Sequence, residues 1–552
     1  MSSPVHAGAS VHYSDCAPGS ACVPALNVRC AWFFAGAIDM GSNHRQPLRW
    51  FHYCFLVFAA VFLYLNLFIL PATPIAGTDN DQSLYLHNAM RMFDGQMIYR
   101  DFFQFTPPGT ELVYLALFKL FGIRAWIPNA TLAVLGFSLT WLCVFISRKI
   151  LKGLTAYLPG LLFLVLAFHS DLDASHHWFS VLAVIASTAL IIPERNLTRV
   201  AGAGVLCALA SFFTQARGAL AVVGFALFLA WEHRKRPRGD GTLFRSEVVL
   251  AACFTAVTVA LNLYFVWNVG LRRFLWSTVT FGIKYYPAEK QMNSLQAYMA
   301  VVPRLANWRH VPDPGWVFIH ALVPLIYLLF FARCWREFPR KPEQPWSRLM
   351  LVNLAGLFLF VGVAPAPVYW RLCVVSLPGF IILAWFLRSP GKLQVLTRRV
   401  LWLGTVAAMV GIVMHQQTSW RASLDTPTGR AAFFNQSDFE RYQWLVLQTH
   451  PPEPFFDCSG QAYFLLGLRS PAEVSFLTDS DYLRPEQARD VEESLERNRV
   501  PVVEWCTNLD FGIRPDDHLG SLREYLHTHY HAAGAPVGSM HVLIRNGASL
   551  MK

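Results

Sequence analysis

The sequence is poor in charged residues. Asp, Glu, Lys and Arg make up 15% of its 552 residues, whereas 54% are hydrophobic and 14% are aromatic. Soluble domains usually contain about 25% charged residues, so this composition excludes an ordinary soluble protein. A chain this apolar is typical of a protein that lies within a membrane.

Motifs for metal binding and for secretion are also lacking. The 11 cysteines do not show the paired spacing of a metal site. Residues 1–46 lack the basic segment followed by an apolar segment that marks a secretory signal, so we expect a disordered N-terminal extension. Translation could start at Met1 or at Met40, which is followed directly by basic residues and a long apolar run.

The basic charge of the chain does not indicate a nucleic-acid partner. The formal net charge is +11, but Lys and Arg are concentrated in short loops between apolar runs. That distribution is the one that sets the orientation of a membrane protein. The sequence therefore predicts contact with membrane lipid and no contact with nucleic acid.

The apolar runs predict the fold class. A membrane span takes about 17 to 25 mainly apolar residues. Basic residues follow every second run, and Lys and Arg stay on the cytoplasmic side, so alternate loops lie inside the cell. We predict an all-α polytopic membrane protein with about eleven transmembrane helices, within a transmembrane domain over residues 47–415. The predicted spans are 51–71, 126–147, 155–170, 178–192, 199–215, 217–232, 247–268, 315–332, 348–364, 371–387 and 399–415.

The hydrophilic tail, residues 416–552, follows an odd number of spans and is therefore expected outside the cytoplasm. Its mixture of helix-like and strand-like patterns predicts a small α/β domain. Cys458 and Cys506 could form a disulfide there, because extracytoplasmic compartments are oxidising. The tail lacks the spacing of a catalytic motif, which favours structural support or handling of an acceptor.

The apolar stretch from Leu112 to Phe121 fits poorly as a membrane span. It is short and contains Lys119, and it follows Pro107-Pro108. Pro suits the first turn of a helix, so this pair can end an extended segment and start a new helix. We expect a helix that is half inserted from the outer side, since a full span would place the basic residues between Arg148 and Lys152 outside.

The first external loop, residues 72–108, is long and polar. Three of its carboxylates could act as a base or as metal ligands, namely Asp79, Asp81 and Asp101. A plainer interpretation is a solvated loop in which an Asp caps the start of a helix. The residues alone favour this plainer interpretation.

A family resemblance changes the interpretation of this loop. Its sequence contains Asp81-Gln82-Ser83-Leu84-Tyr85, then Asp94-Gly95, then Tyr99-Arg100-Asp101-Phe102-Phe103 and Pro107-Pro108-Gly109. This order resembles the first periplasmic loop of the GT-C superfamily, in the branch that contains protein mannosyltransferases and the aminoarabinose transferase of lipid A. The motif covers about 30 residues, and the resemblance extends more loosely to the many spans and the external tail.

The resemblance implies roles for residues of this loop. Asp81 matches the catalytic aspartate, which takes a proton from an acceptor hydroxyl that attacks the anomeric carbon of a polyprenyl-phosphate sugar. Asp101 is the second catalytic candidate, and it could instead orient Arg100 or a substrate hydroxyl, or form a plain surface pair. Asp79 takes the role of Asp81 if the alignment with the family motif is shifted by two residues. Gln82 stands where the family usually has Glu, and Tyr85 is a further substrate-binding candidate.

A lipid-phosphate donor needs cations where the phosphate leaves, because the negative charge stays on the leaving group. The expected cations at the outer surface are Arg100, Arg217, Lys284 and Arg371, with Tyr285 beside Lys284. A charge at the depth of Arg217 or Arg371 usually has a partner or a function. The alternative is that such side chains extend to lipid headgroups.

The external turn from Ser170 to Trp178 contains two acidic residues and the adjacent His176 and His177. Neighbouring histidines on one helix point in different directions and cannot easily share an ion. We therefore predict no metal ligands here, and a divalent cation stays an open alternative. We expect the histidines to hydrogen-bond to sugar hydroxyls or to Asp81, with Trp178 as a stacking platform; a Trp at the membrane interface is the plainer interpretation.

Together these features predict a GT-C glycosyltransferase of the bacterial inner membrane. It would move a sugar from a polyprenyl-phosphate donor to a glycan, lipid or protein acceptor at the outer face. One alternative is a transporter or flippase of a lipid-linked glycan, although the sequence lacks the internal symmetry that transporters often show. A second alternative is a non-catalytic scaffold, which Gln82 in place of Glu keeps open.

Overall fold

A computed structural model of the chain describes residues 46–77, 81–235, 241–286, 314–451, 453–478, 483–510, 517–534 and 540–548. The chain divides into two compact units, Met1–His52 and Tyr53–Lys552, and the residues of the candidate site belong to the second. Most of the predicted N-terminal extension, residues 1–45, lies outside the described residues, and so does Asp79.

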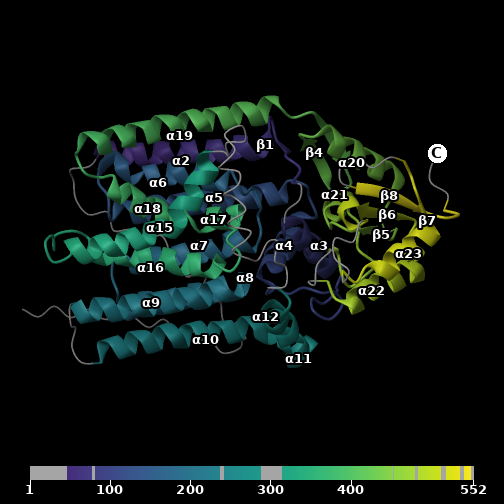
Figure 1. The fold of residues 1–552 in the computed structure, drawn as a ribbon, viewed down its shortest axis with the longest axis horizontal. Coiled ribbons are helices and arrows are strands. Elements are labelled where there is room, and N and C mark those ends of the chain that lie inside the picture. Colours follow the sequence, from purple (N-terminus) through teal and green to yellow (C-terminus); the bar gives the residue numbers. More distant parts are fainter. Residues whose placement is uncertain are drawn as a thin grey trace, which may run out of the picture. The chain divides into compact units, whose positions relative to one another are not determined.

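The helices coincide with the predicted spans, and several of them run side by side in Figure 1. Six described helices are long and apolar enough to cross a membrane, or seven when α17 and α18, bent by 66°, count as one span. Three shorter apolar segments, α6 with η3, α7 and α8, occupy further predicted spans. The predicted class of all-α polytopic membrane protein is confirmed. The helices are α2 (Gln46–Leu67), α5 (Ile127–Arg148), α6 (Leu158–Leu162) continued by the π-helix η3 (Phe163–Phe168), α7 (His176–Ile191), α8 (Leu197–Phe213), α9 (Gln215–Lys235), α10 (Thr242–Val269), α15 (Pro314–Glu337), α16 (Trp346–Val363), α17 (Tyr369–Val375), α18 (Leu377–Phe386) and α19 (Lys392–Thr418).

Burial separates inner helices from outer ones. The apolar windows of α5 and α16 are 56% and 61% buried, whereas those of α10 and α19 are 11% buried. Exposed apolar side chains on a membrane helix face lipid, so α10 and α19 form part of the lipid-facing surface. Small residues allow the inner helices to touch: a Cβ on Gly218 of α9 would lie 2.0 Å from the carbonyl oxygen of Cys207 of α8. This contact fixes the start of α9, where Arg217 lies.

Two helices outside the predicted spans carry much of the first external loop. They are α3 (Asp81–Phe93) and α4 (Gly109–Phe121). Pro108 occupies the position before α4, as expected for a residue that ends an extended segment and starts a helix. The helix expected between Leu112 and Phe121 is therefore confirmed, and Glu111, Tyr114 and Phe118 are buried on one side of it.

The C-terminal region is α/β, as predicted, and Figure 1 shows it in the yellow-green and yellow of the last residues. A hairpin of β3 (Ala422–Thr426) and β4 (Gly429–Phe433) precedes a four-stranded sheet in the order β5-β6-β8-β7. Cys458 and Cys506 form the disulfide that the sequence left open. The elements of this region are β5 (Phe455–Asp457), β6 (Val502–Cys506), β7 (Tyr530–Ala532), β8 (Met540–Arg545), α20 (Gln436–Gln448), α21 (Ala462–Leu466), α22 (Pro485–Arg497) and α23 (Gly520–His529).

The C-terminal region holds α3 in place through direct contacts. Arg91 of α3 donates to the carbonyl oxygen of Ala472 at 2.8 Å. The ring of His87 stacks on Tyr463 of α21 at 4.1 Å. Asp94, just after α3, pairs with Arg469 at 2.6 Å. The helix that begins with Asp81 is thus fixed along its length by the tail, which agrees with a supporting role for that region.

Candidate functional site

The start of α3 is fastened to the turn before α7. The backbone N–H of Gln82 donates to Oδ1 of Asp173 at 2.8 Å, and the N–H of Ala174 donates to Oε1 of Gln82 at 2.8 Å. Asp173 therefore caps the first turn of α3 from another segment, since helix N-termini leave N–H groups unpaired. The side chain of Gln82 accepts the hydrogen bond from Ala174 without carrying a charge. A Glu side chain at the same position would repel the carboxylate of Asp173.

Asp81 lies beside both histidines of α7. One ligand atom of each of Asp81, His176 and His177 lies within 4.8 Å of the others. Nε2 of His177 lies 3.8 Å from Oδ2 of Asp81, whose side chain is 48% exposed. The expectation that Asp81 and a histidine lie together is consistent with this geometry. We define these three residues as the Asp81 cluster.

The prediction that the two histidines point in different directions is wrong. Their ring centroids lie 3.8 Å apart. His176 is the first residue of α7, so the regular spread of side chains around a helix does not yet separate it from its neighbour. The hydroxyl of Tyr85 holds Nδ1 of His176 at 2.6 Å, and Arg217 holds Nδ1 of His177 at 2.7 Å.

Arg217 is buried behind His177 and positions it. Its Nη1 donates to the carbonyl oxygen of His177 at 2.8 Å and to Oγ of Ser180 at 2.9 Å. Its Nη2 donates to Nδ1 of His177. Arg217 therefore has the partners that a charge at this depth requires.

Arg371 is a second buried cation of the site. Its Nη2 donates to the hydroxyl of Tyr286, and its guanidinium lies 4.6 Å from the ring centroid of Trp370. The ring of Trp370 in turn lies 4.9 Å from that of His177. The positive charge of Arg371 acts on Asp81 and opposes the rise in the pKa of that carboxyl.

The site concentrates acidic residues as well as cations. Desolvation raises the pKa of Asp81, and the charge of Arg371 opposes that rise. Desolvation and then the charge of Asp81 raise the pKa of Asp173 to about 7. Desolvation and the charges of Asp173 and Asp81 also raise the pKa of Asp171. An acid with a raised pKa next to a charged partner is a common mark of a functional site.

The hydrogen-bond chemistry of His177 does not suit a metal ligand. An Arg guanidinium only donates, so Nδ1 of His177 must accept and carries no proton. The ring proton therefore lies on Nε2, the nitrogen that faces Asp81. A protonated nitrogen does not bind a metal ion, which leaves Asp81 and His176 as protein ligands. Two ligands fall short of the three or four that protein zinc sites use.

The pair of Arg100 and Asp101 lies apart from the Asp81 cluster. Both guanidinium–carboxylate contacts of this pair measure 2.9 Å, and Asp101 also accepts from the N–H of Met97 at 2.7 Å. The side chains are 51% and 33% exposed. Among the contacts of the described residues, neither side chain reaches the cluster. This arrangement matches the surface pair that the sequence left as an alternative.

Lys284 and Tyr285 precede Tyr286 in the chain, and within the described part of the chain no contact of theirs with the Asp81 cluster is found. Nζ of Lys284 lies 5.2 Å from the ring centroid of Tyr285. Arg484 of the tail lies 4.4 Å from the same ring centroid. Tyr286, the next residue, is the one that bonds to Arg371. The segment after η4 (Trp276–Phe281) and α12 (Gly282–Lys284) thus brings aromatic rings and cations to one place.

The structure corrects the expectation for Trp178. Its side chain is fully buried, its Nε1 donates to the carbonyl oxygen of Asp171 at 3.0 Å, and its ring packs on Phe163 and Phe168. It is neither a stacking platform nor a membrane-interface Trp, because the turn before α7 folds over it.

Sequence reasoning missed two contributors to the site. Trp370 and Asp173 had no assigned role, although the first is an aromatic neighbour of a predicted cation and the second belongs to the acidic turn. Their partners lie on other elements, so spacing along the chain gave no direct signal.

Comparison with known proteins identifies the fold. Known family models do not match the chain, and no curated protein sequence matches it. The crystal structure of ArnT from Cupriavidus metallidurans bound to undecaprenyl phosphate is similar, with a TM-score of 0.56 and 13% identity, over 90% of this chain and 98% of that chain. The crystal structure of the Archaeoglobus fulgidus oligosaccharyltransferase in the apo form is also similar, with a TM-score of 0.50 and 12% identity, over 85% of this chain and 71% of that chain. At such low identity the likeness establishes the architecture, and the chain is a polytopic membrane protein with the GT-C glycosyltransferase fold.

Proposed function

We propose that the chain is a membrane glycosyltransferase that moves a sugar from a polyprenyl-phosphate carrier to an acceptor at the extracytoplasmic face of the membrane. The fold supports the reaction class, because both similar structures are glycosyltransferases. ArnT is described with undecaprenyl phosphate bound, which supports a donor of the same chemical class.

Asp81 acts as the general base in this proposal. Its carboxylate is open to an incoming group yet close to His177, and desolvation raises its pKa. A raised pKa makes a carboxylate a better proton acceptor near neutral pH. Nε2 of His177 lies 3.8 Å from Oδ2 of Asp81, too far for a hydrogen bond, and places a polar N–H on the side of the carboxylate where the acceptor would bind. His176 and Tyr85, held together at 2.6 Å, line the same place and bind sugar hydroxyls.

Arg371 and Arg217 stabilise the leaving phosphate. The acceptor hydroxyl gives its proton to Asp81 while its oxygen attacks the anomeric carbon. The bond from that carbon to the phosphate oxygen breaks, and the electron pair stays on the phosphate. Fixed cations lower the free energy of this step, because they meet negative charge as it develops. Lys284, Tyr285 and Arg484 guide the lipid phosphate towards Arg371.

The side of the membrane follows from charge and from redox state. Basic residues lie at the ends of the helices remote from Asp81, and such residues stay in the cytoplasm. The disulfide between Cys458 and Cys506 belongs to the tail, which contacts α3. Disulfides persist in oxidising compartments. Both features support placing the Asp81 cluster and the tail outside the cytoplasm, in the periplasm of a bacterial inner-membrane protein.

The observation that carries the proposal is that Asp81 lies 3.8 Å from His177 and within range of the charge of Arg371, which opposes the rise in its pKa. Membranes that contain the full chain are incubated with radiolabelled polyprenyl-phosphate sugars, and labelled products are identified. Asp81→Asn should abolish transfer while the protein level stays normal. Asp101→Asn is the matched control, because it makes the same change in the surface pair and should keep most activity. Full activity of Asp81→Asn, or equal losses in both variants, would refute the role of Asp81.

A further inference from the structure

A helical segment directly after α10 exposes apolar side chains, although it is too short to cross a membrane. It consists of α11 (Leu271–Leu275), η4 and α12, which follow one another without a break, and Figure 1 shows α11 and α12 at one end of α10. Four of its apolar side chains are 43% to 74% exposed and recur at every fourth position. We define these four as the apolar stripe, namely Leu271, Leu275, Val279 and Ile283.

The apolar stripe lies along one side of the segment. A spacing of four residues slightly exceeds the 3.6-residue turn of an α-helix such as α11, so the side chains drift around it in one direction. The π-helix η4 has a wider turn, closed by hydrogen bonds between residues five apart, so the drift there runs in the opposite direction. The change from α-helix to π-helix therefore keeps the four side chains in one row.

The side of the segment opposite the apolar stripe is fixed to the protein. The ring centroid of Phe281 lies 4.8 Å from that of Phe103. Nε2 of Gln215 donates to the carbonyl oxygen of Thr278 at 2.9 Å and to that of Phe105 at 2.8 Å. The segment is therefore packed into the folded structure, and the exposure of the apolar stripe belongs to its outer side.

The charged side chains of the segment lie near the tail. Nη2 of Arg273 lies 3.6 Å from Oε1 of Glu473. Lys284 ends the segment and lies 5.2 Å from the ring centroid of Tyr285, which Arg484 of the tail approaches at 4.4 Å. The tail thus meets the charged side chains and leaves the apolar stripe exposed. A helix with one charged side and one exposed apolar side is typical of a membrane interface.

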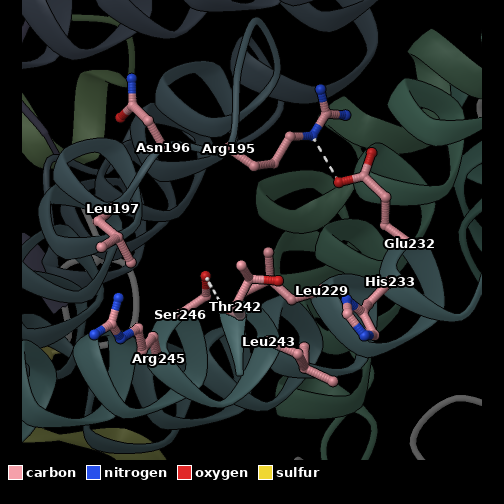
Figure 2. A pocket seen from close by; sticks show the side chains of 10 residues that line it. All are labelled: Arg195, Asn196, Leu197, Leu229, Glu232, His233, Thr242, Leu243, Arg245 and Ser246. Carbon is pink, nitrogen blue, oxygen red and sulfur yellow. Dashed lines mark hydrogen bonds and ion pairs between the residues drawn. The ribbon is translucent and has the colours of Figure 1, made fainter. Parts of the chain in front are cut away.

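The helix α10 indicates where the membrane surface lies. Its 28 residues measure roughly 42 Å at 1.5 Å per residue, which matches a bilayer with its headgroups. Figure 2 shows Arg245 and Ser246 of the first turns of α10 at a polar cavity that Arg195 and Glu232 also line. Basic residues at the end of a span stay in the cytoplasm. We therefore assign the opposite end of α10, at Val269, to the outer surface.

The apolar stripe continues the lipid-facing surface of α10. Only Gly270 separates α10 from the segment, and its φ of +87°, which Gly adopts readily, turns the chain there. The apolar window of α10 is 11% buried, and Trp267 near its end is 86% exposed, as is typical of a Trp where membrane meets water. A hollow of about 650 Å³ joins the end of α10 to Arg272, Leu275 and Trp276. Cationic, apolar and aromatic side chains together suit the headgroup layer.

We propose that residues 271–284 lie in the outer headgroup layer of the membrane, with the apolar stripe against phospholipid chains. The partner is the lipid surface, since the stripe directly continues a lipid-facing span. The buried side of the segment contacts Gln215, two residues before Arg217, so the segment holds the outer end of α9 at the membrane surface. The contact with lipid holds or fails independently of the glycosyltransferase reaction.

Photo-cross-linking in lipid nanodiscs tests this placement. The full chain carries p-benzoylphenylalanine in place of Leu275 or Ile283, and the nanodisc contains dioleoyl phosphatidylcholine with radiolabelled acyl chains. Both positions should give labelled protein on irradiation. The positive control is Val259 of α10, which is 58% exposed. The matched negative control is Leu447 of α20, which is 61% exposed on the tail and should stay unlabelled.

The point of attachment on the lipid reports the depth of each position. Val259 lies ten residues, roughly 15 Å, before the end of α10 and so near the middle of the bilayer. It should attach far down the acyl chains. Leu275 and Ile283 should attach to the first methylenes of the chains, close to the glycerol. Fragmentation of the lipid adducts by mass spectrometry distinguishes the two.

Thermal unfolding verifies that each variant is folded. Labelling of Val259 alone, or labelling of Leu447 as strong as that of Ile283, would overturn the proposal. A cross-link to a second copy of the chain, seen as a band of twice the mass, would assign the apolar stripe to a dimer interface and would also overturn it. Attachment of Ile283 near the ends of the acyl chains would contradict its place in the headgroup layer.

Discussion

The guanidinium of Arg217 donates a hydrogen bond of 2.7 Å to Nδ1 of His177. Because Arg has no acceptor, this contact fixes the proton of the neutral imidazole on Nε2. It also excludes a doubly protonated His177, because an N–H at Nδ1 would then face an N–H of Arg217. Nε2 lies 3.8 Å from Asp81, so a buried arginine determines what the histidine presents to the candidate base.

Replacing His177 should show separately what its contact with Arg217 and its contact with Asp81 contribute. In His177→Asn the side-chain oxygen can take the place of Nδ1 and accept from Arg217, but nothing reaches towards Asp81. We expect normal folding and a loss of transfer activity of about 10- to 100-fold, typical of a positioning contact to a general base. Activity and thermal unfolding in detergent measure the two effects.

His177→Ala provides the comparison. It removes the acceptor of a buried guanidinium, which costs about 1–3 kcal/mol for an unpaired buried donor. Its unfolding temperature should therefore fall below that of His177→Asn. Equal stability of the two variants would show that the bond from Arg217 to Nδ1 does not determine the state of His177.

Zinc chelation should leave activity unchanged. Since Nε2 of His177 carries the proton, the Asp81 cluster offers too few protein ligands for a tightly held zinc ion. Protein purified with a zinc chelator and assayed with it present should match protein assayed with added Zn²⁺. Activity that is lost on zinc chelation and restored by Zn²⁺ alone would refute the assigned tautomer.

The pH profile should report the raised pKa of Asp81. A base acts in its deprotonated form, so kcat/KM should fall as pH falls through the pKa of the free enzyme. Desolvation raises that pKa above the ordinary value of 3.8, with Arg371 opposing the rise. We expect the acid limb above the ordinary range of an aspartate. In Arg371→Gln, where the opposing charge is removed, the limb should move to still higher pH.

An unchanged acid limb in Arg371→Gln would contradict the electrostatic coupling between Arg371 and Asp81. If Arg371→Gln is inactive, the pH dependence of binding of the lipid donor is measured in its place. The same shift should appear in binding, since Asp81 titrates in the free protein.

Gln82 should tolerate replacement by Glu better than by Ala at low pH. Oε1 of Gln82 accepts from Ala174, and a carboxylate oxygen could keep this bond. Glu would add negative charge beside Asp173, whose pKa is already raised to about 7. Gln82→Glu should therefore lose stability as pH rises, whereas Gln82→Ala should lose about 1 kcal/mol at every pH, the usual net worth of a hydrogen bond. Thermal unfolding at pH 5 and pH 8 distinguishes the two.

The sequence was sufficient for the membrane architecture because apolar length and loop charge are local signals. The bend between α17 and α18 was not predicted, because residues 371–387 were expected as one span. The helix α4 was recognisable from Pro107-Pro108 and the short apolar run that follows them. The disulfide could be proposed because Cys458 and Cys506 both lie in the tail that was expected outside the cytoplasm. None of the confirmed conclusions needed a contact between distant residues, and each is recovered in the fold.

The chemistry of the site was less accessible from sequence. Asp81, His177 and Arg371 come from three separate segments, and the sequence named all three without showing how they meet. The direction of His176 and His177 was mispredicted, because Tyr85 and Arg217 determine it across the fold. Asp101 was the second catalytic candidate after Asp81, and its pairing with Arg100 was left open as an alternative until the conformation of the two side chains showed it.

Glu111, a residue without a role in the sequence analysis, provides a further test through protonation. Its side chain is buried on α4, and burial raises its pKa from 4.5 to about 7. Oε1 accepts from Gln104 at 2.9 Å. Among the described residues, Oε2 of Glu111 and Oδ1 of Asn88 have no hydrogen-bond partner, although the two side chains approach each other. A proton on Oε2 would supply the donor that both oxygens need.

The sign of the pH dependence follows from the direction of this shift. The folded state holds its proton up to about pH 7, while the unfolded state loses it near pH 4.5. The folded state is therefore fully favoured below pH 4.5, loses stability as pH rises to about 7, and carries a constant penalty above that. Glu111→Gln keeps the acceptor for Gln104, supplies a permanent donor to Asn88 and removes the penalty. The gain at pH 8 should be on the order of 3 kcal/mol, from the size of the pKa shift.

Thermal unfolding in detergent should thus show little difference between Glu111→Gln and the wild type at pH 4.5. At pH 8 the variant should unfold several degrees higher. Glu111→Ala is the control, because it removes the acceptor and should be less stable at both pH values. If Glu111→Gln gained nothing at pH 8, the carboxylate would have to be accommodated as an anion. The protonated contact between Glu111 of α4 and Asn88 of α3 would then be wrong.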